Sequence, residues 1–200
     1  SLSNEVRALC EDTEHNLWVG LKDGKIRIYD KNRTELGYFT ETGTISHAGI
    51  PLKGNTYCIF QDSKHNIWIA TKGEGLVKAR PQGGGHYKLT RYCHSRDDIY
   101  SLSDNNVYCV YEDVKGRIWV ATFGGGINYL THNRGGREIF VNHRNNLKGF
   151  PIDNCHKVRF VTGDHRGNIW IATTVGALMV NSDFKKPEDA VFHHYVRVQN

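Results

Sequence analysis

The chain of 200 residues has 38% hydrophobic and 24% charged residues, a balance typical of a globular protein that can bury a core. Its formal net charge of +5 mildly favours an anionic partner, but the basic residues are scattered among acidic ones and predict no nucleic-acid interface. The sequence contains no run of about 18 apolar residues, which is the length that a membrane-spanning helix needs. The five cysteines form no CxxC pair, which argues against a zinc site or a disulfide framework, and no cofactor or metal is expected.

The chain repeats one pattern four times, in "EDTEHNLWVGLKDGKI", "QDSKHNIWIATKGEGL", "EDVKGRIWVATFGGGI" and "GDHRGNIWIATTVGAL". In each copy an aspartate stands six residues before a tryptophan, and successive tryptophans are 50 or 51 residues apart. The pairs are Asp12 and Trp18, Asp62 and Trp68, Asp113 and Trp119, and Asp164 and Trp170. A repeat of this length predicts an architecture of stacked supersecondary units.

In chain order, the repeat divides the sequence into four predicted blades at residues 1–48, 49–99, 100–148 and 149–200. The third copy shows the elements of one blade, because runs of β-branched and aromatic residues alternate with turns that contain glycine or asparagine. Its four predicted strands are Val107 to Glu112, Ile118 to Thr122, Ile127 to Leu130 and Glu138 to His143. No helical period of adequate length appears, so the predicted fold class is all-β.

A four-stranded antiparallel sheet of this size cannot bury both faces alone, so the copies must stack face to face. Radial stacking of such sheets is a β-propeller, and four blades form either a small closed ring or an arc of a larger propeller. The chain ends on "FHHYVRVQN", an outer strand of the fourth blade, so no shared strand closes a ring. We therefore expect an arc, whose two uncovered blade faces favour self-association.

The repeated tryptophan and aspartate each have a structural interpretation. The tryptophan lies in a run of Ile and Val on the second strand, where an indole can fill the space between sheets. A sugar-stacking platform is the alternative. The aspartate lies at the hairpin turn, where its carboxylate can accept backbone N–H groups about two residues further on. Calcium binding is the alternative there, but Lys115 and Arg117 in the third copy would repel a cation.

The pattern D-x-x-[HG]-[NR]-[LI]-W-[VI]-[AG]-[TL]-x-x-G resembles the two-component regulator propeller repeat. The junction "SLSDNNVYCVYED" is also similar to a blade junction of that family. The match covers all four copies with two departures, since Leu21 replaces the threonine of the other copies and Glu74 stands where they have glycine. The resemblance is fairly specific, because the turn, tryptophan, threonine and glycine positions of the repeat agree together.

This resemblance implies a periplasmic sensor region, usually of two seven-bladed propellers, in an inner-membrane protein. The rest of such a protein is an immunoglobulin-like domain, a membrane helix, a histidine kinase core and a response-regulator part. The implied ligands are oligosaccharides released from a polysaccharide, and the implied output is transcription of the genes that degrade it. The chain would be a non-enzymatic binding fragment and an arc of a seven-bladed propeller.

In a propeller, ligands favour the face that carries the blade junctions and the loops between second and third strands. Five residues before each repeated aspartate stand Arg7, Tyr57, Tyr108 and Arg159, which stacking would place around a central funnel. Tyrosine rings can stack on sugars, and arginine can bind a carboxylate or sulfate in a bidentate manner. An ordinary water-filled channel, or packing between blades, is the alternative interpretation of these four residues.

The second-to-third strand loops add Lys22, Lys72 and Phe123 to the candidate ligand site. Other polar residues of the loops and junctions are expected mostly to be solvated. They are Lys53, His94, Arg96, Asn105, Asn106, Arg144, His156 and Thr174. The favoured partner is therefore an oligosaccharide, with an acidic one suggested by the arginines.

Two other functional classes stay open. Some lyases and glycan-cleaving enzymes are propellers, and fold does not settle function. The sequence gives little support for an enzyme, because it has no G-x-S-x-G or HExxH stretch. The only acidic residue common to the copies is the turn aspartate. A protein-interaction scaffold is the third alternative.

Overall fold

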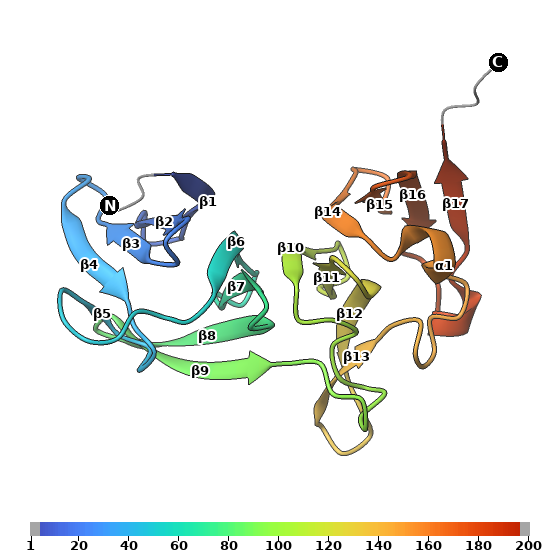
Figure 1. The fold of residues 1–200 in the computed structure, drawn as a ribbon, viewed down its shortest axis with the longest axis horizontal. Coiled ribbons are helices and arrows are strands. Elements are labelled where there is room, and N and C mark those ends of the chain that lie inside the picture. Colours follow the sequence, from blue (N-terminus) through green and yellow to red (C-terminus); the bar gives the residue numbers. More distant parts are fainter. Residues whose placement is uncertain (1–4, 197–200) are drawn as a thin grey trace. The chain divides into compact units, whose positions relative to one another are not determined.

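The computed structural model describes residues 5–196 and shows two compact units, the first ending at Tyr92 and the second beginning at Cys93 (Figure 1). Each unit holds two antiparallel sheets whose strands follow one another in sequence order. One sheet falls within each of the four residue ranges predicted as blades. The predicted class of all-β antiparallel blades is confirmed. The arc stays a prediction.

The first unit contains two stacked sheets, and their first strands β1 and β6 contact each other. The first sheet comprises β1 (Val6–Glu11), β2 (Leu17–Leu21), β3 (Ile26–Tyr29), β4 (Glu35–Phe39) and β5 (Ile45–Ser46). The second comprises β6 (Asn55–Gln61), β7 (Ile67–Lys72), β8 (Leu76–Gly83) and β9 (His86–Tyr92). The first sheet thus has five strands rather than the predicted four. The cause is a turn closed by Thr40 and Thr44, which folds two further residues back onto β4.

The second unit also contains two stacked sheets, which meet along β10 and β14. One comprises β10 (Val107–Glu112), β11 (Ile118–Thr122), β12 (Gly126–His132) and β13 (Glu138–Val141). The other comprises β14 (Val158–Gly163), β15 (Asn168–Thr173), β16 (Gly176–Asn181) and β17 (Phe192–Tyr195). β13 ends two residues earlier than predicted, because the backbone N–H of Asn142 donates to Asn145 Oδ1 rather than to a neighbouring strand.

Two helices of a single turn interrupt the connections of the second unit. They are α1 (Ile152–Cys155) before β14 and the 3-10 turn η1 (Pro187–Asp189) before β17. Both are too short to produce a helical period in the sequence, which explains why none was predicted. Within residues 5–196, no helix has the length and apolar character needed to cross a bilayer.

The repeated aspartate organises the hairpin turn of every blade. Asp62 Oδ1 accepts the backbone N–H groups of Lys64 and Asn66 at 3.0 and 2.8 Å, and Asp12, Asp113 and Asp164 make the equivalent pair of bonds. The predicted turn is therefore present in all four copies. The sequence did not predict the second bond, in which the other carboxylate oxygen accepts the indole Nε1–H of the repeated tryptophan at 2.7 to 2.9 Å.

The tryptophans are packing residues in the first three blades, as predicted. Trp18, Trp68 and Trp119 are almost completely buried, whereas Trp170 is partly exposed. Trp18 makes edge contacts with Phe39 of its own sheet and with Tyr87 of the neighbouring sheet, at centroid distances of 5.2 and 5.5 Å. This aromatic cluster joins the two sheets of the first unit.

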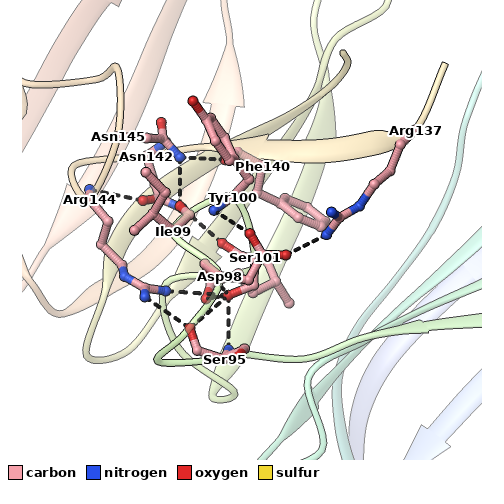
Figure 2. Close-up of polar contacts among 11 residues, drawn as sticks. Ser95, Asp98, Ile99, Tyr100, Ser101, Arg137, Phe140, Asn142, Arg144 and Asn145 are labelled. Carbon is pink, nitrogen blue, oxygen red and sulfur yellow. Dashed lines mark hydrogen bonds and ion pairs between the residues drawn. The ribbon is translucent and has the colours of Figure 1, made fainter. Parts of the chain in front are cut away.

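A polar clamp fixes the segment that leads into the third blade (Figure 2). The guanidinium of Arg144 donates to the carbonyls of Ser95 and Arg96 at 2.9 and 3.1 Å. Asn145 donates to the carbonyl of Ile99 at 2.8 Å, and Ser101 closes the turn through the carbonyl of Ser95. The junction is therefore tied to the end of the blade that it precedes, although some forty residues of chain separate the two.

Candidate ligand-binding surfaces

The four candidate residues of the first strands share one backbone position. In each first strand the pairing with the second strand shifts by one residue at the candidate residue, so that Arg7, Tyr57, Tyr108 and Arg159 occupy β-bulges. A bulge leaves its extra residue unpaired and re-aims the side chain relative to a regular strand. The sequence pattern located these residues but did not predict the bulge that presents them.

In the first unit the structure brings Arg7 and Tyr57 together from adjacent sheets. Arg7 Nη1 donates to the Tyr57 hydroxyl at 2.8 Å, and its guanidinium carbon lies 5.1 Å from the centre of the ring. Glu5 pairs with Arg7 at 3.4 Å and with Lys22 at 2.7 Å. The hydrogen bond from Lys22, together with the charges of Lys22 and Arg7, lowers the pKa of Glu5. The cations of this unit are therefore partly neutralised by a carboxylate that the sequence analysis did not select.

In the second unit the structure brings Tyr108, Phe123 and Arg159 together. The rings of Tyr108 and Phe123 stack with centroids 4.8 Å apart and an interplanar angle of 17°. The guanidinium carbon of Arg159 lies 5.0 Å from the Phe123 centroid, and Lys157 Nζ lies 5.7 Å from it. We call these four residues the aromatic-cation cluster. In the described part of the chain, no carboxylate pairs with Arg159 or Lys157.

Backbone hydrogen bonds place Phe123 in this cluster. The Phe123 N–H donates to the carbonyl of Asn106 at 2.8 Å, and the N–H groups of Gly124 and Gly126 donate to the carbonyl of His156 at 3.0 and 2.9 Å. The β11–β12 loop is thus fixed between the junctions that precede β10 and β14. This agrees with the expectation that such loops share a face with the blade junctions.

The remaining candidates divide between these surfaces and solvent. Lys72 is exposed at the end of β7, where its backbone pairs with Asn55. Lys157 is a functional candidate that sequence reasoning missed, and its place two residues before the repeated Arg159 position was the available signal. The prediction that all first-strand residues line one funnel spans both units and stays a prediction.

Most junction side chains are expected to be solvated, and several of them instead bond the protein. Arg144 is half-buried in the clamp of Figure 2 and also contacts His94 Nδ1 at 3.2 Å. The Asn105 side chain accepts the His94 backbone N–H at 2.7 Å. These residues hold the backbone, because a chain segment without sheet pairing must satisfy its polar groups through side chains.

The described residues 5–196 contain no group of three or more His, Cys, Asp or Glu side chains arranged to hold a metal ion. The repeated aspartates use their oxygens on backbone, amide and indole donors instead. Phenol, guanidinium and ammonium groups dominate the candidate surfaces, and such groups bind and orient ligands.

The fold and repeat define the class of protein as one built of β-propeller blades, three described with four strands and one with five. The family model described as "Two component regulator propeller" matches residues 1–23, 51–73 and 101–124. The chain carries repeats of the two-component regulator propeller family, which confirms the resemblance seen in its sequence. The fourth copy lies outside the matched residues but has the same Asp164 to Trp170 hydrogen bond.

Solved structures show the same fold. The extracellular domains of the hybrid two-component systems BT3049 and BT4673 from B. thetaiotaomicron match with TM-scores of 0.72 and 0.69 at 21% and 23% identity. Each match covers 98% of this chain and 25% of the other. Virginiamycin B lyase from Staphylococcus aureus also matches, with a TM-score of 0.64 at 12% identity over 98% of this chain and 57% of the lyase. The likeness to an enzyme at this identity concerns the fold alone.

One relative in sequence is named as a histidine kinase. "Histidine kinase P4" from Formosa agariphila is 30% identical over 71 residues, which are 36% of this chain and 5% of that protein. The chain therefore spans a small part of the relatives that it matches.

Proposed function

We propose that the chain is a ligand-binding segment of the extracytoplasmic sensor region of a hybrid two-component system. The repeat family and the likeness to extracellular domains of such systems support this proposal. The parent protein would be a periplasm-facing histidine kinase anchored in the inner membrane, and this segment would bind ligand without turning it over. Kinase signalling and transcription would respond to that binding.

The proposed ligand is an acidic oligosaccharide, bound at the aromatic-cation cluster of the second unit. The observation that carries this is the position of Arg159 over Phe123, which itself stacks on Tyr108. Flat aromatic faces suit the apolar faces of sugar rings, and a guanidinium without an ion pair can donate two parallel hydrogen bonds to a carboxylate or sulfate. The ammonium group of Lys157 places a second positive charge near the Phe123 ring.

The pair Arg7 and Tyr57 in the first unit is the weaker surface for an anion. Its arginine already bonds the tyrosine hydroxyl and Glu5, so a ligand would have to displace existing partners. Hydrogen bonds that are only exchanged contribute little net free energy. We therefore expect the second unit to contribute most of the affinity.

The test is calorimetric titration of the chain with neutral, uronic-acid and sulfated oligosaccharides. Phe123→Ala removes the aromatic face, and Arg159→Ala removes the guanidinium that would bind the acidic group. Each should weaken binding of an acidic oligosaccharide about tenfold or more. The matched control is Arg166→Ala, because Arg166 is an exposed arginine at the opposite end of the β14–β15 hairpin. It should leave the affinity unchanged.

Three results would contradict the proposal. Acidic oligosaccharides that bind no better than neutral ones would remove the role of Arg159. Shortened products after incubation would indicate an enzyme, and failure of a folded chain to bind any oligosaccharide would favour a protein-interaction scaffold.

Self-association is a second proposed interaction. Trp170 on β15 is partly exposed, and Tyr195 on β17, two strands away in the same sheet, is 51% exposed, with ring centroids 5.4 Å apart. An uncovered aromatic face of this kind favours contact with another surface. Sedimentation equilibrium should show association of the chain that Tyr195→Ser reduces, and a monomer at all concentrations would contradict it.

A further inference from the structure

The second unit contains a pocket of about 560 Å³ away from the aromatic-cation cluster. Residues of the third blade and of the segment between β16 and β17 line it, so it lies between the two sheets of one unit. Its volume is within the range of about 300–1,000 Å³ that is usual for small-molecule sites. Apolar side chains form part of its wall, including Ile139, Val141 and Phe184.

The pocket contains a residue that breaks the internal repeat. At the position where the other copies have Asn16, Asn66 and Asn168, the third copy has Arg117. Each asparagine donates its Nδ2–H to the turn aspartate at 2.8 to 3.1 Å. Arginine keeps this bond through Nε, at 2.7 Å from Asp113, and extends a guanidinium beyond it. Asparagine is thus sufficient for the turn bond, and the extra length of arginine carries its guanidinium to the segment between β16 and β17.

The guanidinium of Arg117 lines the pocket, and not all of its N–H donors are bonded to the protein. Nη2 donates to the carbonyl of Ser182 at 2.5 Å, and the guanidinium carbon lies 4.3 Å from the ring centre of Phe184. Among residues 5–196 no acceptor bonds Nη1. An arginine whose Nε and Nη2 are bonded to the protein while Nη1 is available is positioned to bind an anion.

A second unpartnered polar group lines the same pocket. Tyr129 on β12 is only 4% exposed, yet its hydroxyl has no hydrogen-bond partner in the described residues. The hydroxyl is not among the fully buried polar atoms that lack a partner, so it is open to the pocket, where a ligand atom could bond it. Burial raises the pKa of Tyr129 to about 12, so the hydroxyl is a neutral donor at neutral pH.

The charges around the pocket favour an anion. Its charged lining residues are Arg117, Arg137 and Lys185, and it has no acidic lining residue. Asp113 pairs with Nε of Arg117, and Asp98 pairs with Arg137, as Figure 2 shows for the second pair. Lys185 has no ion pair among the residues that the structure describes. Glu188 lies outside the lining and accepts a hydrogen bond from Asn146, which lines it.

We propose that this pocket binds a small carboxylate that carries an aromatic ring. Arg117 Nη1 and Lys185 would bind the carboxylate, the Tyr129 hydroxyl would bond a polar atom of the ligand, and Phe184 would contact the ring. The pocket between the sheets of the first unit lacks this character, because its charged lining residues include Asp12 and Glu14. The site is separate from the proposed oligosaccharide surface.

Ligand-observed NMR titration of the chain tests this with three probes. They are 4-hydroxybenzoate, its neutral analogue 4-hydroxybenzyl alcohol, and glucuronate, which is a carboxylate without an aromatic ring. We expect a dissociation constant of about 1 mM or lower for 4-hydroxybenzoate, and binding at least about tenfold weaker for the other two.

Variants locate the site. Arg117→Asn restores the residue of the other copies and should fold, yet should weaken 4-hydroxybenzoate binding about tenfold. Lys185→Gln changes an exposed side chain and should weaken binding about threefold, whereas Glu188→Gln should strengthen it. Arg166→Asn is the matched control, and neither it nor Phe123→Ala should alter the affinity.

Several results would overturn the proposal. They are an absence of binding at about 10 mM 4-hydroxybenzoate, equal binding of the neutral alcohol, tighter binding of glucuronate, or unchanged affinity in both Arg117→Asn and Lys185→Gln. Loss of affinity in Phe123→Ala would instead assign the ligand to the aromatic-cation cluster.

Discussion

The indole Nε1 of Trp68 donates a hydrogen bond of 2.7 Å to Asp62 Oδ2, so that one carboxylate joins the hairpin turn to the core residue of the next strand. The other oxygen accepts the backbone N–H groups of Lys64 and Asn66. Turn geometry and indole position are thereby coupled in a buried environment, where a donor left without an acceptor is costly. The same coupling in every copy explains why aspartate and tryptophan recur together.

Replacement of this carboxylate should be among the most destabilising changes in the first unit. Asp62→Ala removes the acceptor of buried donors, and we expect it to reduce the free energy of unfolding by about 2–4 kcal/mol. Asp30 is a suitable control, since it accepts the N–H groups of Asn32 and Thr34 in the same way but bonds no indole. Asp30→Ala should cost about 1 kcal/mol. Urea denaturation of both variants tests this, and equal losses would show that the indole bond contributes nothing.

Acid should weaken the fourth blade through Asp164. The hydrogen bond from Trp170 and that from Asn168 lower the pKa of Asp164 well below its ordinary value of 3.8. Because the folded-state pKa is depressed, the stabilisation is complete above the unfolded pKa and is lost as the pH falls through and below about 4. Urea midpoints measured from pH 7 to pH 3 should fall less steeply for Asp164→Asn than for the unchanged chain. Parallel acid slopes would contradict this.

Gly126 should tolerate a side chain less well than another glycine of the same blade. Both Gly126 and Gly136 have positive φ, at 74° and 77°, so alanine at either should cost about 1–2 kcal/mol from backbone strain. A Cβ at Gly126 would also collide with the ring of Phe150, whereas none of the described atoms lies within 4 Å of a Cβ at Gly136. Overpacking should add about 1–3 kcal/mol for Gly126→Ala alone. Thermal unfolding of the two variants measures the difference, and equal melting temperatures would show that Phe150 moves aside without cost.

The elements that the sequence predicted well are those defined by local pattern. The strands of the third blade follow from runs such as that from Val107 to Glu112, and the Asx-type turns follow from the position of an aspartate between two such runs. The indole bond was missed, because spacing alone does not show that two side chains on either side of a hairpin turn point toward one another. Their joint recurrence in four copies was the available signal.

The candidate surfaces depend on features with no local signature. A β-bulge at Tyr108 or Arg159 is set by the register of two strands, and these two residues share no chemistry that would mark it. Contacts such as that of Lys157 with Phe123 join segments that are distant in sequence. The position of a candidate residue could therefore be predicted from the repeat, but its neighbours could not.

Arg144 should be essential to the junction before the third blade. Its planar guanidinium bonds the carbonyls of Ser95 and Arg96 and the hydroxyl of Ser101 simultaneously, which a lysine cannot reproduce. We expect Arg144→Lys to reduce the free energy of unfolding by about 1–3 kcal/mol and to increase hydrogen exchange of the amides in the segment from Ser95 to Ser101. Arg96→Lys is the matched control, because the Arg96 side chain is exposed. If both variants exchange like the unchanged chain, the backbone turn alone holds the junction and the clamp of Figure 2 is dispensable.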